Sequence, residues 1–452
     1  MEPFKFYLIA DPHYFASKLG AYGKEYDEFM HYEQKCFAET QSINEAAFAW
    51  LENAHDAENV FIVGDLVFNG ERESHKEFIE HLYRLKASGK RVFVVTADHD
   101  FKQTREECFA FDDTGKTHPE NLPREELFDL YKDFGFGDAI AVDRQHLSYM
   151  AQLSDGVRLL ALNNDGASDG GRHFDEEHIA WIKEQTAKAR EDGQTMIAMN
   201  HYPILPGQPI FALVGSTYQE DGKAVADLLA DEGVHLIFTG HMHMHSVNEY
   251  VTEQGNKLYD VCTGSLIADP SVIRLVTVED ESTVDIKTID APDFEWDTGG
   301  KTCKEYLRDM FDRMIVNVLY DMAYDTERMM NKFHLEKKLK PVLKAIGKIL
   351  QKTTVGGLGR MLFIKTDKSI RKEKVKDVAA ELVRVIFEGN QYFKEGTPMG
   401  DALLAVFGRL RPVFKKINAK NFDGTPADVY ELLKNSAGNY DIDDYNCVLK
   451  LK

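Results

Sequence analysis

Five short stretches of the chain combine carboxylate or imidazole side chains with the end of an apolar run. They are Asp11-x-His13, Gly64-Asp65, Asp98-His99-Asp100, Asn200-His201 and Gly240-His241-x-His243. Clustered carboxylates and neutral imidazoles are ligands for borderline divalent metals. Taken singly, each signal is weak. An Asp-Pro turn with an incidental histidine explains the first stretch, and a solvated histidine tract explains the last.

The elements expected around these stretches place all of them at one edge. Strands are expected at 4–10, 59–63 and 91–95, with helical patterns between them that include one at 41–54. This alternation predicts βαβ units and a parallel sheet. Further strands are expected at 195–199 and 234–238. In open α/β sheets, ligands bind outside the carboxyl ends of the strands, which is where every stretch lies.

Such a set of side chains suits a dinuclear metal site. Two metal ions about 3.5–4 Å apart lower the pKa of a bound water, polarise a phosphoryl oxygen and stabilise charge in an in-line displacement. A nearby histidine that is not a ligand can protonate the leaving alkoxide. Hydrolysis of a small phosphoester is therefore the chemistry that these residue types favour.

The rest of the chain falls into two parts. A mixed insertion at 101–145 holds a helix near 123–134, a hairpin joins strands at 146–151 and 157–163, and helices are expected at 175–192 and 222–231. Four short strands, near 247–252, 257–262, 272–279 and 282–289, predict an antiparallel second sheet. Residues 291–300 are typical of a linker. Helical periodicity then predicts an all-α domain over 301–452, which follows a catalytic domain at 1–290 in the sequence.

Composition limits the classes of function. The formal charge of −21 argues against broad nucleic-acid binding. The five scattered cysteines include no CxxC pair, so neither a disulfide framework nor a zinc ribbon is indicated. No run of about 20 apolar residues predicts a transmembrane helix. The chain enters a strand at Phe4 without a basic and apolar leader, so a cytoplasmic location is expected.

One basic segment stands out against this acidic background. The stretch from Lys337 to Lys376 is rich in lysine and arginine. Such a segment is most often a solvated face or a helix docked on an acidic surface, and less often a helix on a membrane surface.

As an ordered set, the five motifs resemble the calcineurin-like metallophosphoesterase superfamily over about residues 4–290. The family series is DxH, GD, GNH[DE], a lone H before aromatic or proline residues, and GHxH. Two further segments, Gly64–Glu71 and Leu147–Tyr149, are similar to its bacterial cyclic-nucleotide-phosphodiesterase-like branch, in which some members carry an added helical domain. The resemblance implies an α/β fold: a four-layer, two-sheet sandwich flanked by helices.

The resemblance also implies roles for individual residues. One metal ion would be held by Asp11, His13, Asp65 and His243, and the second by Asp65, Asp98, His201 and His241. Asp65 would bridge the two ions, which would be Mn, Fe or Zn. His99 would be the catalytic acid or a phosphate-binding group, and Asn69 would contact substrate. His235 and His245 lie outside the family pattern and are expected to be structural.

The chain departs from the family where Ala97-Asp98 replaces Gly-Asn. The aspartate keeps an oxygen ligand but adds a negative charge, which either tightens the second metal or slows attack by the bridging water. Three functions stay open. The first is phosphodiester hydrolysis by a dinuclear-metal-activated hydroxide, with a cyclic nucleotide as one candidate substrate. The others are phosphomonoester hydrolysis and non-catalytic binding on a degenerate fold. The helical domain would cap the site, restrict substrate size or mediate homo-oligomerisation.

Overall fold

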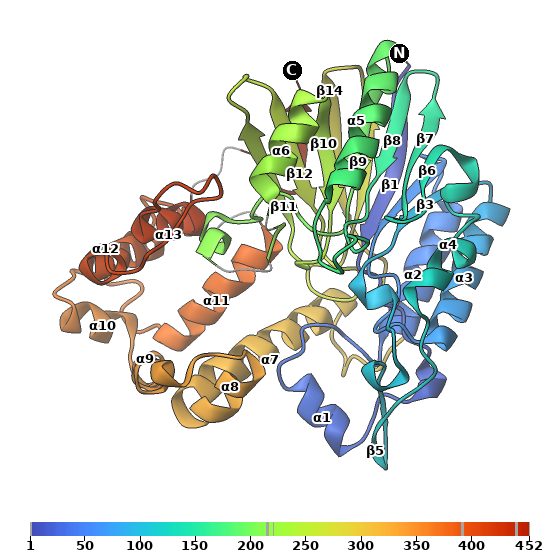
Figure 1. The fold of residues 1–452 in the computed structure, drawn as a ribbon. Helices are drawn as coiled ribbons and strands as arrows, with labels where there is room; N and C mark the ends of the chain where they lie inside the picture. Colours follow the sequence, from blue (N-terminus) through green and yellow to red (C-terminus); the bar gives the residue numbers. More distant parts are fainter. Residues whose placement is uncertain (1, 214–216, 220, 390–392, 439–441, 452) are drawn as a thin grey trace.

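The computed structural model describes residues 2–213, 217–219, 221–389, 393–438 and 442–451. Two β-sheets pack face to face, with helices outside both of them (Figure 1). The first sheet contains β1 (Phe4–Ala10), β2 (Asn59–Val63), β3 (Arg91–Val95), β13 (Val272–Val278), β14 (Thr283–Asp290) and β15 (Cys447–Lys450). The second contains β6 (Ala139–Asp143), β7 (Ser148–Ser154), β8 (Val157–Ala161), β9 (Thr195–Met199), β10 (Val234–Thr239), β11 (Ser246–Val251) and β12 (Lys257–Cys262).

The main core lies between the two sheets. The ring of Phe6 on β1 stacks on that of Phe61 on β2, with centroids 4.2 Å apart, and meets Phe238 on β10 edge-on at 5.3 Å. All three side chains are fully buried. Because helices cover the outer faces as well, the central strands are buried on both sides, which explains why they read as continuous apolar runs.

Four helices form the two outer layers of the sandwich. Apolar side chains of α2 (Thr40–Asn53) and α3 (Arg72–Ala87), including Phe48 and Phe78, join the core of the first sheet. Those of α5 (Glu176–Glu191) and α6 (Gly222–Asp231), including Ile182 and Leu229, pack on the second. The expected four-layer α/β sandwich is confirmed.

Strand order brings the functional stretches to one edge. The first sheet runs β15-β14-β13-β1-β2-β3, with β1, β2 and β3 parallel. The second runs β11-β12-β10-β9-β8-β7-β6, with β8, β9, β10 and β12 parallel. The predicted βαβ units and the β7–β8 hairpin are confirmed.

Two sequence-based expectations were wrong. The four strands after His245 do not form a separate antiparallel sheet: β11 and β12 extend the second sheet, while β13 and β14 extend the first. Local alternation cannot encode this division, because it specifies which face of a strand is buried but not its partner. The helix expected near 123–134 is only α4 (Leu127–Leu130), preceded by a 3₁₀ turn at Arg124–Glu126. The insertion also contains a hairpin of β4 (Ala110–Asp112) and β5 (Gly115–Thr117).

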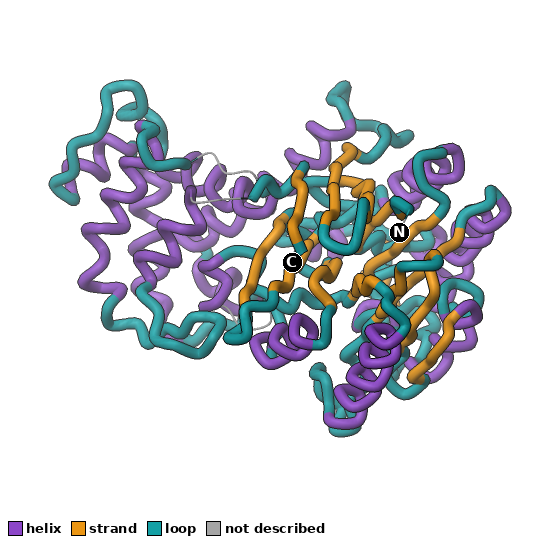
Figure 2. The backbone as a smooth tube through the Cα atoms, turned by 90° about the horizontal axis from the view of Figure 1, so that it is seen from above, coloured by secondary structure: helices purple, strands orange, loops and turns teal. Residues whose placement is uncertain are grey.

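The C-terminal part is mostly helical and lies beside the sandwich (Figure 2). Its helices are α7 (Cys303–Tyr324), α8 (Thr326–Lys332), α9 (Lys340–Lys352), α10 (Val355–Met361), α11 (Val375–Glu388), α12 (Pro398–Phe414) and α13 (Val429–Gly438). The chain then returns to the sandwich, where β15 pairs antiparallel with β14, a strand that the sequence analysis missed. Among the described residues, no helix has the length and apolar character needed to cross a bilayer.

Direct contacts join this helical region to the sandwich. The Asp321 carboxylate on α7 lies 2.7 Å from His31 Nε2 and accepts a 2.6 Å hydrogen bond from the Tyr32 hydroxyl; both partners lie in the loop after α1 (Lys24–Met30). The backbone N–H of His245 donates to the carbonyl of Phe387 on α11 at 2.8 Å. The histidine-rich loop after β10 is therefore tied to the helical region.

Candidate metal centre

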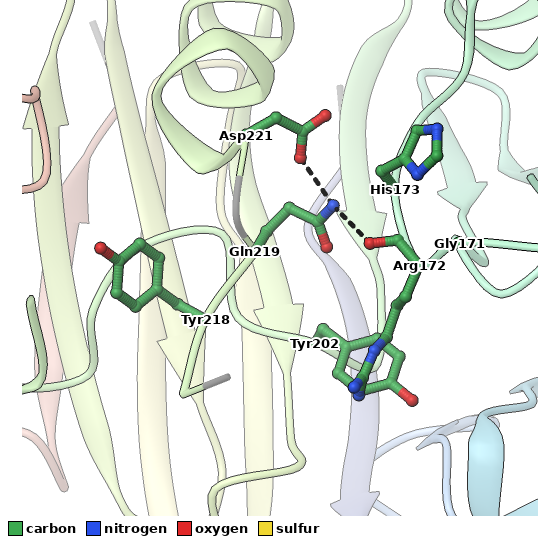
Figure 3. Close-up of a pocket in the computed structure, with 7 residues that line it drawn as sticks. All are labelled: Gly171, Arg172, His173, Tyr202, Tyr218, Gln219 and Asp221. Carbon is green, nitrogen blue, oxygen red and sulfur yellow. Dashed lines mark hydrogen bonds between the residues drawn. The ribbon is translucent and has the colours of Figure 1, made fainter. Parts of the chain in front are cut away.

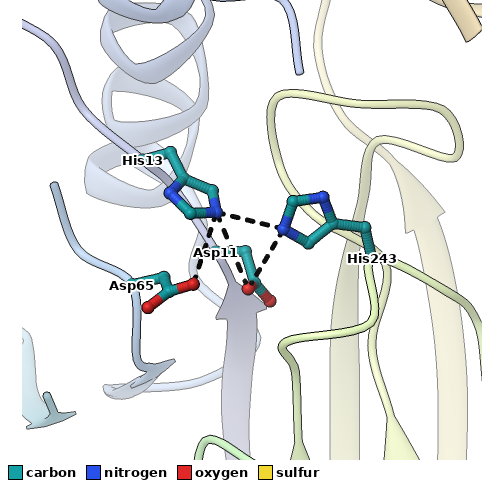
Figure 4. A group of neighbouring side chains, drawn as sticks. All are labelled: Asp11, His13, Asp65 and His243. Carbon is teal, nitrogen blue, oxygen red and sulfur yellow. Dashed lines mark hydrogen bonds and ion pairs between the residues drawn. The ribbon is translucent and has the colours of Figure 1, made fainter. Parts of the chain in front are cut away.

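Asp65 lies at the centre of three groups of potential metal ligands. The ligand atoms of Asp11, His13, Asp65 and His243 all lie within 4.8 Å of one another (Figure 4). Asp65 also groups with His201 and His241, and separately with Asp98 and His99. The fold thus brings together all seven residues that the sequence analysis named as ligands, from five different strand ends.

The side chains converge closely. His13 Nε2 lies 3.5 Å from Asp65 Oδ2 and 3.0 Å from His243 Nε2. His243 Nε2 lies 3.4 Å from Asp11 Oδ1, and His201 Nε2 lies 3.2 Å from Asp65 Oδ2. These distances place donor atoms of both sheets around a common centre.

The donor set fits metal ions. Two buried carboxylate oxygens in the cluster, Asp65 Oδ1 and Asp98 Oδ1, have no hydrogen-bond partner in the described structure. Leaving a buried polar atom unpaired costs about 1–3 kcal/mol, so such atoms call for a ligand. Carboxylate and imidazole donors without thiolate suit divalent metal ions. The residues present would hold two such ions.

The backbone at these positions is strained. Eight non-glycine residues in the described ranges have φ in the left-handed region, and five of them belong to the cluster. They are Asp11 (50°), His13 (38°), Asp65 (48°), His241 (65°) and His243 (52°). This conformation costs an L-residue of order 1–3 kcal/mol and persists where the surrounding structure requires it. The strain turns each side chain away from its strand and into the cluster.

Glycines before two of the ligands permit this close approach. A Cβ atom at Gly64 would lie 2.3 Å from His201 Nδ1, and one at Gly240 would lie 2.4 Å from Asp11 Oδ2. Gly64 also has a φ of +71°. Glycine therefore precedes Asp65 and His241 because a side chain would collide with a neighbouring ligand at either position. At Gly64 the backbone conformation favours glycine as well.

Burial and charge set the protonation of the cluster. Burial lowers the pKa of His241 to about 4 and that of His13 well below its ordinary value, which favours the neutral, metal-binding form of both rings. Burial alone would raise the pKa of Asp65, but His201, His99 and His13 together bring it well below its usual range. Burial disfavours a proton on His201, yet Asp65 and Asp11 raise its pKa to about 10. His201 thus supplies positive charge where a metal ion would supply it.

Asp98 lies in a group of its own with Asp65 and His99, while His201 and His241 form another group with the same Asp65. Its assignment as a ligand of the second metal ion stays a prediction. Its side chain as a whole is 43% exposed, although Oδ1 is buried, and its Oδ2 lies 3.8 Å from Arg172 Nη1. Burial and Asp65 act to raise the pKa of Asp98, but the neighbouring histidines lower it overall, so the side chain is ionised. The positive charge of Arg172 therefore lies next to the negative charge that Asp98 adds at this position.

His99 and Asn69 are held by backbone carbonyls. The Nδ1–H of His99 donates to the carbonyl of Phe68, which leaves Nε2 for a ligand or a proton. Burial lowers the pKa of His99, with a further contribution from Lys35. The Asn69 side-chain amide donates to the Glu107 carbonyl at 2.7 Å. The role of Asn69 as a substrate contact stays a prediction.

A cavity of about 660 Å³ lies beside the second group of ligands (Figure 3). It is lined by Gly171, Arg172, His173, Tyr202, Tyr218, Gln219 and Asp221. The Arg172 guanidinium lies over the Tyr202 ring, 4.4 Å from its centroid, and that ring meets His241 edge-on at 4.7 Å. The sequence analysis missed both residues. Only the position of Tyr202 directly after His201 signalled its place.

Asp260 supports two of the ligand-bearing turns. Its Oδ2 accepts hydrogen bonds from the backbone N–H groups of Ile204 and Leu205, at 2.7 and 2.9 Å. Its Oδ1 accepts the Thr239 hydroxyl at 2.6 Å. The turn after His201 and the strand end before His241 are thus fixed by one buried carboxylate. A lone acidic residue inside the apolar run Lys257–Cys262 was the available sequence signal.

Comparison with known proteins assigns the class. The model of the calcineurin-like phosphoesterase family matches residues 4–245, and the chain belongs to this family. No curated protein matches the chain.

Similar solved structures include a dimetal phosphatase from Danio rerio, at 14% identity, over 64% of this chain and 99% of that one, with a TM-score of 0.44. A purple acid phosphatase from yellow lupin (Lupinus luteus) seeds has 15% identity, 65% and 52% coverage and a TM-score of 0.44. The NAD nucleotidase of Haemophilus influenzae has 12% identity, 78% and 62% coverage and a TM-score of 0.35.

Proposed function

We propose that this phosphoesterase hydrolyses phosphodiesters at a two-metal site centred on Asp65. The observation that carries the proposal is that Asp65 belongs to each of the three ligand groups at this site, as a carboxylate bridging two ions must. Bound there, two metal ions would acidify an attacking water and polarise the phosphoryl group. One ion would be held by Asp11, His13, Asp65 and His243, and the other by Asp65, His201 and His241, with Asp98 at its edge.

Protein side chains supply the remaining charge. Lys35 is 8% exposed, and its Nζ lies 4.8 Å from the centroid of the Phe68 ring. Its charge contributes to lowering the pKa values of both His13 and His99. We assign Lys35 to the phosphoryl oxygens and His99 Nε2 to the leaving oxygen. An anionic substrate would raise the pKa of His99 and so load the proton that the leaving group needs.

The extra carboxylate favours a diester over a monoester. A phosphomonoester is largely a dianion at neutral pH, whereas a diester carries one negative charge. Asp98 is partly exposed at the site and repels the dianion more strongly. The cavity lined by Arg172, Tyr202 and Tyr218 offers room for the second ester substituent. A cyclic nucleotide is one diester of suitable size.

We also propose that catalysis and the helical region belong to separate domains. Catalysis belongs to the expected domain at 1–290, joined by β15, and 291–300 links it to the helical part of 301–452. All ligand groups come from residues 11–243, which supports this division.

The test combines metal content with substrate preference. Protein purified without chelator should contain about two transition-metal ions per chain. It should cleave bis-aryl phosphates faster than mono-aryl phosphates after addition of Mn²⁺, with cyclic nucleotides assayed in parallel. Asp65→Asn should be inactive. Faster cleavage of monoesters would replace the diester assignment, and protein with no metal and no activity would favour a non-catalytic role.

A further inference from the structure

Helix α9 exposes an apolar stripe that no part of the described chain covers. Leu339, at its N-terminus, is 38% exposed, Val342 56% and Ile346 44%. Their spacing of three and four residues places them along one side of the helix. The adjacent side, at Gly347, packs on α7, where a Cβ atom would lie 2.6 Å from the Ala323 nitrogen. The apolar arc of α9 is thus wider than the part that α7 covers.

The polar side of α9 is strongly basic. Lys340, Lys344, Lys348 and Lys352 recur every four residues. Lys340 pairs with Glu327 at 2.8 Å, but the other three form no ion pair with any described residue. Residues 337–376 contain 13 Lys or Arg and two Asp or Glu, in a chain whose net charge is −21. Positive charge is therefore concentrated on one region of an acidic protein.

We propose that α9 binds the surface of an anionic lipid bilayer. A helix with an exposed aliphatic stripe and a lysine-rich polar side lies in the interface plane, with the stripe toward the acyl chains and the lysines toward the headgroups. Negative charge elsewhere on the protein does not prevent this contact. Dissolved salt screens the repulsion between that charge and the anionic lipids beyond about 8 Å at physiological ionic strength.

Two other occupants fit less well. A symmetric contact between two copies through α9 would set Lys344 and Lys348 of one chain against the same lysines of the other. Nucleic acid would satisfy the lysines, but single strands bind through aromatic stacking, and the stripe is formed by Leu339, Val342 and Ile346. Aliphatic side chains beside unpaired lysines match a lipid interface.

Vesicle co-sedimentation of the full-length, metal-loaded protein tests the proposal. Binding is expected to phosphatidylcholine vesicles that contain phosphatidylglycerol, and not to phosphatidylcholine alone. Lys344→Glu/Lys348→Glu should lower the partition coefficient at least about tenfold, since each lysine near an anionic surface contributes strongly. Val342→Ser/Ile346→Ser should lower it as well, because the stripe would no longer enter the acyl boundary.

Matched controls come from the sandwich. Lys183→Glu/Lys188→Glu on α5 reverses two exposed lysines of one helix, and Val251→Ser removes an exposed apolar side chain. Both should bind vesicles like the wild type. Failure to bind anionic vesicles overturns the proposal, as does binding unaffected by Val342→Ser/Ile346→Ser. Binding to heparin without binding to vesicles would assign the surface to a soluble polyanion instead.

Discussion

The Nε2 atoms of His13 and His243 lie 3.0 Å apart, although the residues are 230 positions apart in the chain. Their rings meet edge-on, with an interplanar angle of 70°, rather than stacking. His13 follows β1 of the first sheet and His243 follows β10 of the second. The site therefore exists only when both sheets are in place.

The shared position of Asp65 predicts coupled loss of both metals. Asp65→Asn should reduce metal content toward zero and lower kcat/KM at least about a hundredfold, because ligand loss exceeds the effect of losing a supporting residue. His13→Ala removes a side chain from one group only and should retain about one ion. Elemental analysis of both variants distinguishes these outcomes. Two ions in Asp65→Asn would show that Asp65 is not the bridge.

Gly240→Ala should displace Asp11. The added Cβ would lie 2.4 Å from Asp11 Oδ2, so the carboxylate or the His241 turn must shift. Metal affinity is expected to fall about 10–100-fold, the range for disturbed ligand support. Gly408→Ala on α12, where the nearest atom is 3.9 Å away, is the matched control. Equal affinities for both variants, measured by metal titration, would contradict the geometry.

Asp98 and Arg172 should act as a pair. Asp98→Asn keeps an oxygen ligand and is expected to retain activity within about tenfold, while Arg172→Ala leaves the Asp98 charge uncompensated and lowers kcat/KM. Because both side chains are about 40% exposed, their coupling in a double-mutant cycle should be about 0.5–1 kcal/mol. Additive effects in the double variant would mean that Arg172 acts through Tyr202 alone.

The buried carboxyl group of Glu71 should make the free energy of unfolding depend on pH. It is fully buried, and burial raises its pKa to about 7. A raised carboxyl pKa contributes stability that is present below the unfolded-state pKa and is lost as pH rises through about 7. Between pH 5 and 8 the wild type should therefore lose about 2 kcal/mol of unfolding free energy relative to Glu71→Gln. Urea unfolding at both pH values measures this difference.

Glu73→Gln provides the control for this pH effect. The neighbouring hydrogen bond from Lys18 lowers the pKa of Glu73, so its contribution lies below this pH window. The stability difference between Glu73→Gln and the wild type should stay constant from pH 5 to 8. A flat difference for Glu71→Gln as well would show that Glu71 titrates normally.

The sequence predicted the fold class and which residues the strand ends bring together, but it did not predict how the later strands divide between the two sheets. The end of a strand is predictable from nearby residues alone, because an apolar run such as Asn59–Val63 stops there. The same pattern predicts that the polar residue after the run, Asp65, lies at the strand end. Partner choice is not local: β13 and β14 read like β11 and β12 but join the other sheet. Arg172 was not predictable because it reaches Asp98 from a loop, and no periodicity places a loop side chain.

The pairing of β15 with β14 has a consequence for biosynthesis. The described helices α7 to α13 are made after β14 but before β15, the strand that pairs with its free edge. On the ribosome, the hydrogen-bonding edge of β14 therefore stays open until residues 447–450 have emerged. An open edge is a template for pairing with other chains, so nascent chains stalled within the helices should be more prone to aggregate than the finished protein.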